Sequence, residues 1–88
     1  LALKKKDISI SYHRSHAHYL SKGGSLKKMI AELYGFKEGC SKGVGGSMHL
    51  IDNSIGFQGS VPIVGATIPI ACGYGLANKL QSNKECNI

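Results

Sequence analysis

The chain has no long apolar run, and none approaches the roughly 20 consecutive residues that a membrane-spanning helix needs. Aromatic residues make up only 7% of it and are not interleaved with the cations, which argues against a surface that stacks single-stranded nucleic acid. The three cysteines, Cys40, Cys72 and Cys86, include no Cys-x-x-Cys pair. An odd number of widely spaced cysteines indicates free thiols. We therefore expect an intracellular, reducing compartment and a protein that binds no membrane.

Acidic residues are also scarce. Five Asp and Glu stand against 11 Lys and Arg, which gives a net charge of +6. Nine of these cations lie between Lys4 and Lys42, so the charge is concentrated in the first half of the chain. This imbalance suits an anionic partner. Nucleic acid, a phosphorylated ligand and a simple solvated lysine face all remain open on this evidence.

Glycine, by contrast, is abundant. The chain is long enough for one small domain with a modest core, and 42% of its residues are hydrophobic. Seven of its 12 glycines fall in a glycine-rich segment, residues 39–65. Ordering so many glycines is costly, and the segment also carries Met48, Leu50, Phe57 and Ile63, which is too apolar for a flexible tether. We therefore predict an ordered functional loop that approaches another group closely.

A strand is predicted near the beginning of the chain. Ile8, Ile10 and Tyr12 alternate with serines, the pattern of a short β-strand. The cationic cluster at residues 13–18 follows directly and would stand at the carboxyl end of that strand. In open α/β sheets, ligands collect at that end.

A helix is predicted from Ser25, which can cap its free amides, to just before Gly35, which suits the left-handed position after a helix. Lys28 and Glu32 are four residues apart and are expected to form a weak surface pair. The apolar side chains between these ends recur at helical spacing, at Leu26, Met29, Ile30 and Leu33.

A second helix is predicted to begin near Thr67 or Ile68, with Pro69 close to its first position. Small residues recur in it four apart, as Ala71 with Gly75 and as Gly73 with Ala77. Such spacing lets another backbone approach, so we expect this helix to be buried against another helix, within the fold or across a subunit interface. A polar exit, residues 78–87, would follow.

The histidines and Arg14 are the candidate chemical groups. His16 and His18 would share a face if they lay on a strand, and zinc would then need further ligands such as His49 and Cys40. No zinc spacing is present, and polar groups lining a cleft are the alternative. Arg14 matches phosphate oxygens through its planar guanidinium, with a surface salt bridge as its alternative.

Four blocks occur in order along nearly the whole chain and carry a family resemblance: HRSH at 13–16, MIAELYG at 29–35, GCSKGVGGSMH at 39–49 and IVGA at 63–66. Together they resemble the alpha subunit of thiamin-diphosphate-dependent 2-oxo acid dehydrogenases, of the pyruvate and acetoin dehydrogenase types. The resemblance implies that residues 1–88 are the amino-terminal part of an α/β thiamin-diphosphate-binding domain with a parallel sheet, truncated before the metal-binding motif.

The resemblance also implies a function. The family decarboxylates a 2-oxo acid, most directly pyruvate, and transfers the acyl group to the lipoyl domain of a core acyltransferase. Its alpha subunit works with a beta subunit in an α2β2 assembly, and the cofactor is held between them. We expect the chain alone to be inactive, since its magnesium ligands would lie beyond Ile88 and the activating glutamate belongs to the beta subunit.

By resemblance, the cofactor-binding residues are His13, Arg14, Pro62 and Val64. His13 and Arg14 match the pair that holds the diphosphate, and Val64 matches the apolar residue that props the bent cofactor. Pro62 replaces the commoner glycine near the pyrimidine and removes a backbone N–H there. The resemblance implies no catalytic and no metal-binding residue within this chain.

Two alternatives accompany this hypothesis. One is an acetoin or branched-chain 2-oxo acid dehydrogenase alpha subunit. The other is a small basic module that binds phosphate or nucleic acid through Arg14 and the lysine-rich half. The family hypothesis predicts no nucleic-acid partner, and a bacterial cytoplasm, a mitochondrial matrix or a plastid would each suit it.

Overall fold

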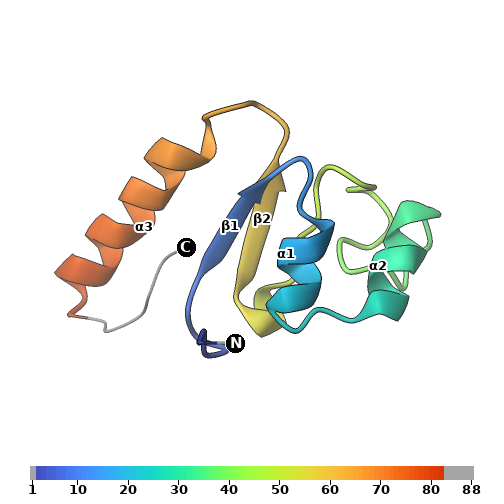
Figure 1. Ribbon diagram of the computed structural model, residues 1–88, viewed down its shortest axis with the longest axis horizontal. Coiled ribbons are helices and arrows are strands. Elements are labelled where there is room, and N and C mark those ends of the chain that lie inside the picture. The colour runs from blue at the N-terminus through green and yellow to red at the C-terminus, as the bar shows by residue number, and fades with distance from the viewer. Residues whose placement is uncertain (1, 83–88) are drawn as a thin grey trace.

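The computed structural model describes residues 2–82, so Cys86 and the last part of the predicted polar exit lie outside the described residues. Within that range the chain folds into a small α/β arrangement (Figure 1). Its elements, in order, are β1 (Ser9–Tyr12), α1 (His16–Ser21), α2 (Leu26–Leu33), the 3₁₀ helix η1 (Asn53–Ile55), β2 (Phe57–Val61) and α3 (Thr67–Leu80).

The sheet formed by the two strands is parallel, as expected. Ser9 lies opposite Phe57, and Ile10 lies opposite Gly59, so β2 holds one extra residue, Gln58, at this point. Such a bulge bends a strand locally. The remaining pairs keep a regular register up to Tyr12 and Val61, and both strands therefore end at the same edge of the sheet.

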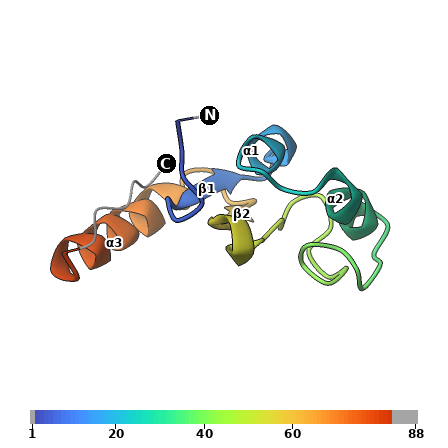
Figure 2. The same ribbon diagram turned by 90° about the horizontal axis from the view of Figure 1, so that it is seen from below.

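The core lies on one side of this sheet. Tyr19, Met29, Leu50, Ile55 and Phe57 are buried together, and Cys40 packs against them. The rings of Tyr19 and Phe57 meet edge to face, with centroids 5.8 Å apart. These residues come from α1, α2, β2 and the segments between them, whereas α3 lies on the other side of the sheet (Figure 2). The core thus holds the irregular part of the chain against the strands.

The helix predicted from Ser25 is confirmed as α2. Ser25 is its N-cap and accepts a hydrogen bond from Lys28 N at 3.4 Å. Gly35 follows the C-cap with a φ of +75°, and the N–H groups of Gly35 and Phe36 donate to Glu32 and Ala31. Of the apolar stripe, Met29 is buried as expected, but Leu26, Ile30 and Leu33 stay exposed.

The expectation of one continuous loop over residues 39–65 is wrong. Its second half contains η1 and β2, and only residues 39–51 form an irregular segment, named here the glycine-rich loop. Strand β2 was not predicted from the sequence. Phe57, Gly59 and Ser60 are all buried, so apolar and polar residues do not alternate along the strand.

The second predicted helix is present as α3, with Ala66 as an N-cap that makes no side-chain bond. It packs against β1, and Tyr74 Oη donates to Gln58 Oε1 at 3.5 Å. The expected burial against another helix is not seen among residues 2–82, where Leu76 and Leu80 are exposed. In the same range, every helix is too short or too polar to span a bilayer.

Candidate functional site

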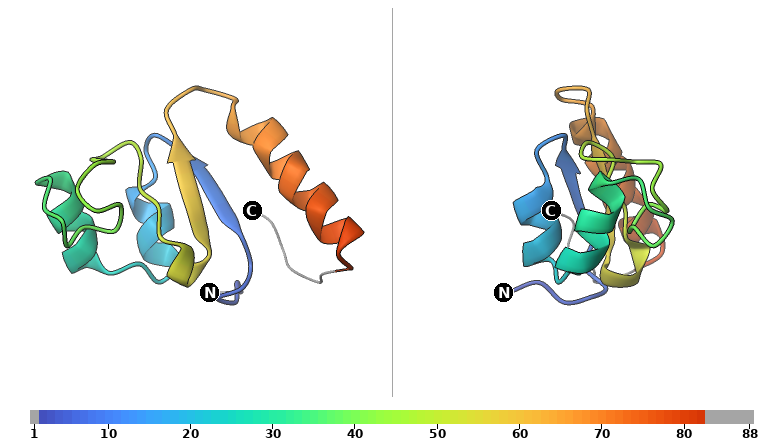
Figure 3. Two further views of the ribbon diagram at one scale, coloured as in Figure 1. Left: turned by 180° about the vertical axis from the view of Figure 1, so that it is seen from behind. Right: turned by 90° about the vertical axis from the view of Figure 1, so that its right-hand side faces the viewer.

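The carboxyl edge of the sheet collects the residues that the sequence singled out. His13 and Arg14 follow β1 directly, and Pro62 and Val64 follow β2. The connection from β2 to α3 rises above the ends of both strands (Figure 3). Two segments about 50 residues apart in the sequence are therefore neighbours here, because parallel strands end at a common edge.

A cavity of about 330 Å³ opens at this edge. It brings His13 and Val64 together as two of its walls. Pro62 is half-buried and lies outside the lining. The lining residues are Tyr12, His13, Val64, Gly65, Thr67 and Ile68.

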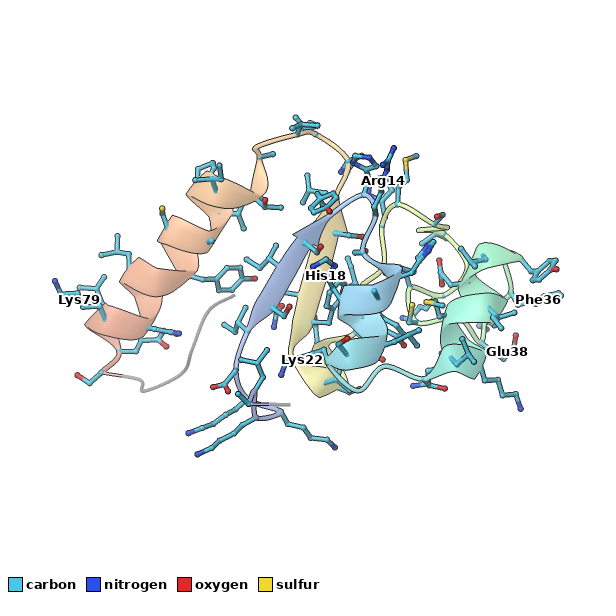
Figure 4. The ribbon with its side chains drawn as sticks, viewed as in Figure 1. Arg14, His18, Lys22, Phe36, Glu38 and Lys79 are labelled. Atoms are coloured by element: carbon cyan, nitrogen blue, oxygen red, sulfur yellow. The ribbon has the colours of Figure 1, made fainter. Side chains whose placement is uncertain are left out.

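The polar groups at this edge are equipped for a hydrogen-bonding ligand. His13 Nδ1 is buried and has no hydrogen-bond partner among residues 2–82, and the same holds for Ser11 Oγ and Ser15 Oγ. Buried polar atoms are almost always paired, so such atoms indicate a missing partner. Arg14 is exposed at the top of the strands (Figure 4), and within the described range no ion pair or hydrogen bond occupies its guanidinium. An anion with several acceptor oxygens suits this set of donors.

Glu32 organises the glycine-rich loop from within. Its side chain is fully buried. Oε2 accepts from the backbone N–H groups of Ser41 and Gly43, both at 2.8 Å, and Oε1 accepts from those of Gly45 at 2.7 Å and Gly46 at 3.1 Å. The expected surface pair of Lys28 and Glu32 is therefore wrong, because the carboxylate faces inward and holds four loop amides.

The charge on Glu32 is stabilised by this arrangement. Burial alone raises the pKa of a carboxyl group, but the four backbone donors outweigh it and hold the pKa of Glu32 below its ordinary value of 4.5. The loop is therefore built around a permanently ionised centre at neutral pH.

A dependence of stability on pH follows from this lowered pKa. A carboxyl group that ionises more readily in the folded state stabilises it fully above the unfolded pKa, and that contribution is lost as pH falls through the folded pKa. We expect the free energy of unfolding to fall faster with acid for the native chain than for Glu32→Gln, beginning near pH 4.5. Urea unfolding of the native chain and of Glu32→Gln at several pH values between 7 and 3 measures this difference. If the free energies of unfolding of the two proteins fell in parallel with pH, the expectation would be contradicted.

Two serine hydroxyls fix the end of the loop. Ser60 Oγ donates to Met48 O and accepts from Leu50 N, both at 2.8 Å. Ser41 Oγ donates to His49 O and accepts from Ile51 N, both at 2.9 Å. Residues 48–51 are thus bonded alternately to Ser60 and to Ser41, which confirms the prediction that the loop is ordered.

A glycine is required where the loop closes on itself. A Cβ atom at Gly45 would collide with the carbonyl oxygen of His49. This approach confirms the close contact that the glycine content predicted, although the group approached is the chain's own backbone. On this side of the molecule a second cavity, of about 360 Å³, is lined by Cys40, Lys42, Val44 and His49 among others.

The histidines do not gather into one site. His16 and His18 lie on α1 and not on a strand, so residues two apart point to different sides of the helix. His16 Nε2 lies 2.9 Å from Ser47 Oγ, whereas His49 lines the second cavity. Across residues 2–82, no three side chains of His, Cys, Asp or Glu converge as metal ligands would. Cys40 and Cys72 are free thiols.

Sequence reasoning missed the roles of Glu32, Ser41 and Ser60. A signal for Glu32 was available, since it lies three residues after the buried Met29 on the inward side of α2 and is followed by a run of glycines with bare amides. No local pattern marks the serines, because their partners depend on how the loop folds back.

Comparisons with known proteins agree with the motifs. Residues 1–88 match the family model described as Dehydrogenase E1 component. The chain is 46% identical over 84 residues to pyruvate dehydrogenase E1 component subunit alpha-1, mitochondrial, of Arabidopsis thaliana, covering 96% of the chain and 21% of that relative. It is 48% identical over 87 residues to pyruvate dehydrogenase E1 component subunit alpha of Rickettsia typhi, covering 98% of the chain and 27% of that relative.

A similar match, 47% identity over 81 residues, is found with the mitochondrial pyruvate dehydrogenase E1 component subunit alpha of Pisum sativum, covering 92% of the chain and 20% of that relative. The chain therefore spans between a fifth and about a quarter of the length of these relatives. Because the family model matches every residue of the chain and the relatives agree with it, the chain belongs to the dehydrogenase E1 component family.

Proposed function

We propose that this chain forms part of the thiamin diphosphate site in the decarboxylating component of a 2-oxo acid dehydrogenase complex. The observation that carries the proposal is the cavity at the carboxyl edge of the sheet, which His13 and Val64 both line. The buried Nδ1 of His13 has no hydrogen-bond partner among residues 2–82. The family match supplies the cofactor class.

In this proposal His13 and Arg14 bind the diphosphate. Arg14 offers a cation with a planar set of donors that no group in the described part of the chain engages. His13 offers a ring nitrogen that needs a partner. Both lie at the edge where a parallel sheet presents its loops to a ligand, which supports a shared role in binding the diphosphate.

Val64 and Pro62 would shape the rest of the site. Val64 is 84% exposed although it is apolar, and it lies beside the cavity, so a bound ring would cover it. Pro62 offers a carbonyl oxygen but no N–H, so it can accept from the ligand and cannot donate. Bound thiamin diphosphate supplies the electron sink for loss of carbon dioxide from a 2-oxo acid, and the protein supplies orientation and electrostatics.

The wider function follows from the relatives. Their names give pyruvate dehydrogenase, so we assign pyruvate as substrate and a lipoyl group as acyl acceptor, in preference to acetoin or a branched-chain 2-oxo acid. A beta subunit in an α2β2 assembly, a lipoyl acyltransferase core and magnesium held by residues outside this chain complete the proposal. The free thiols agree with a reducing compartment, and the named relatives are mitochondrial or bacterial. The family match also favours this function over a basic nucleic-acid-binding module.

Replacing Arg14 tests the proposal. In the assembled enzyme, Arg14→Ala should weaken thiamin diphosphate binding by about 1.5–3 kcal/mol, the range for a hydrogen-bonding partner that is charged. This corresponds to roughly ten- to a hundredfold in the dissociation constant. Isothermal titration with thiamin diphosphate and magnesium measures it.

Lys79→Ala is the matched control, since Lys79 is an exposed cation at the far end of α3 from Arg14 (Figure 4). The Lys79→Ala enzyme should bind thiamin diphosphate with the same dissociation constant as the unchanged enzyme. If the dissociation constants of Arg14→Ala and Lys79→Ala were equal, Arg14 would not be a ligand of the diphosphate.

A further inference from the structure

Ser47 occupies a fixed point between two anchored peptide groups. The N–H of the residue before it, Gly46, donates to the buried carboxylate of Glu32 at 3.1 Å. The carbonyl of the residue after it, Met48, accepts from the hydroxyl of Ser60 in β2 at 2.8 Å. The backbone at Ser47 is therefore held from α2 on one side and from the sheet on the other, although Ser47 itself is exposed.

From this fixed point Ser47 reaches the turn that carries the proposed diphosphate ligands. Its hydroxyl lies 2.9 Å from Nε2 of His16, the first residue of α1. His16 is only two residues beyond Arg14, and Ser15 between them is fully buried. The turn from β1 into α1 is therefore tied at one end by the sheet and at the other by this hydrogen bond.

The contacts from Glu32 to His16 form a sequence in which each one positions the next. Glu32 orders the loop amides, the ordered loop places Ser47, and Ser47 holds His16. Without the last link, α1 would still be held by Tyr19 in the core and by Lys22 at its C-cap, whose Nζ donates to Lys4 O. The amino end of α1, next to Arg14, would lose its tie, and the backbone that carries the exposed guanidinium would have more positions available. Preorganising a charged donor lowers the entropy lost on binding.

From this arrangement we infer that Ser47 and His16 are positioning residues for the anion-binding turn at Arg14. They act through the backbone of that turn and do not themselves contact the ligand. The inference rests on the proposed function, since the ligand used to test it is thiamin diphosphate.

The test is a double-mutant cycle in the assembled enzyme, read by isothermal titration with thiamin diphosphate and magnesium. Ser47→Ala and His16→Ala should each raise the dissociation constant about three- to tenfold, the range for one neutral hydrogen bond. The double variant should be no weaker than either single one, because both remove the same link. Ser47→Thr keeps the hydroxyl and should restore the affinity, and turnover at saturating cofactor should stay unchanged in all of them.

Ser54→Ala is the matched control. Ser54 lies in η1, just before the amino end of β2, and among residues 2–82 its hydroxyl bonds only Asp52. Additive losses in the double variant would mean that His16 or Ser47 contacts the cofactor and would overturn the inference. A lowered melting temperature with unchanged affinity would overturn it as well, by showing a purely structural bond. Arg14→Ala separates the two proposals: if it weakens binding and Ser47→Ala does not, only the positioning role fails, and if neither does, the proposed function fails.

Discussion

Glu32→Gln is expected to lower the free energy of unfolding by about 3–6 kcal/mol, which corresponds to two lost hydrogen bonds to a charged group. The carboxylate accepts from four backbone N–H groups with two oxygens. Glutamine keeps one oxygen and turns an NH₂ group toward the two remaining donors. Those amides would be buried without an acceptor, and a small domain has only about 5–15 kcal/mol of stability in total.

Denaturant unfolding of the chain, followed by circular dichroism, measures this loss. Glu38→Gln serves as the control, because Glu38 is the nearby exposed glutamate and its replacement should change stability by no more than about 0.5 kcal/mol. If both variants unfolded at the same denaturant concentration, the glycine-rich loop would not depend on the buried charge.

Phe57→Ala is expected to lower the free energy of unfolding by about 3–5 kcal/mol, because it leaves a cavity in the core. Phe57 has no exposed surface and packs edge to face on Tyr19. It also begins β2, so its loss weakens the contact between the sheet and the helices on that side. The same unfolding experiment measures it.

Phe36→Ala is the control, because it makes the same replacement at an exposed position. Phe36 is 59% exposed and stacks on Tyr34, which is exposed as well. Replacing Phe36 should lower the free energy of unfolding by well below half as much as replacing Phe57. Similar losses at the two positions would mean that burial of Phe57 does not decide stability.

Local signals in the sequence were sufficient for α2. Apolar spacing, a capping serine and a glycine after the last turn each depend on residues within a few positions of one another. The serine and the glycine were found where expected, whereas only Met29 of the apolar stripe is buried. The parallel pairing of β1 also agrees with what the family resemblance implied. Strand β2 was not predicted, because its glycine, Gly59, and its burial on both faces remove the alternation by which strands are recognised.

Residues of the candidate site were named from the family resemblance and not from such local signals. His13 and Val64 were named from motifs, and the structure places both at one cavity. The long-range contacts that hold the loop were not predictable. Glu32 was assigned to a surface pair with Lys28 because helical spacing allows it, and only the fold shows that the carboxylate faces inward. Bonds between Ser60 and the backbone ten and twelve residues earlier leave no periodic trace.

The two serines that hold residues 48–51 have a consequence for the length of the chain. Successive residues there bond alternately to Ser60 and to Ser41, through the carbonyls of residues 48 and 49 and the amides of residues 50 and 51. One inserted or deleted residue would present every later carbonyl and amide to the wrong serine, just as a register slip reverses the faces of a strand. Surface loops ordinarily tolerate such changes. We expect this one not to, because its hydrogen bonds fix the number of residues although its shape is irregular.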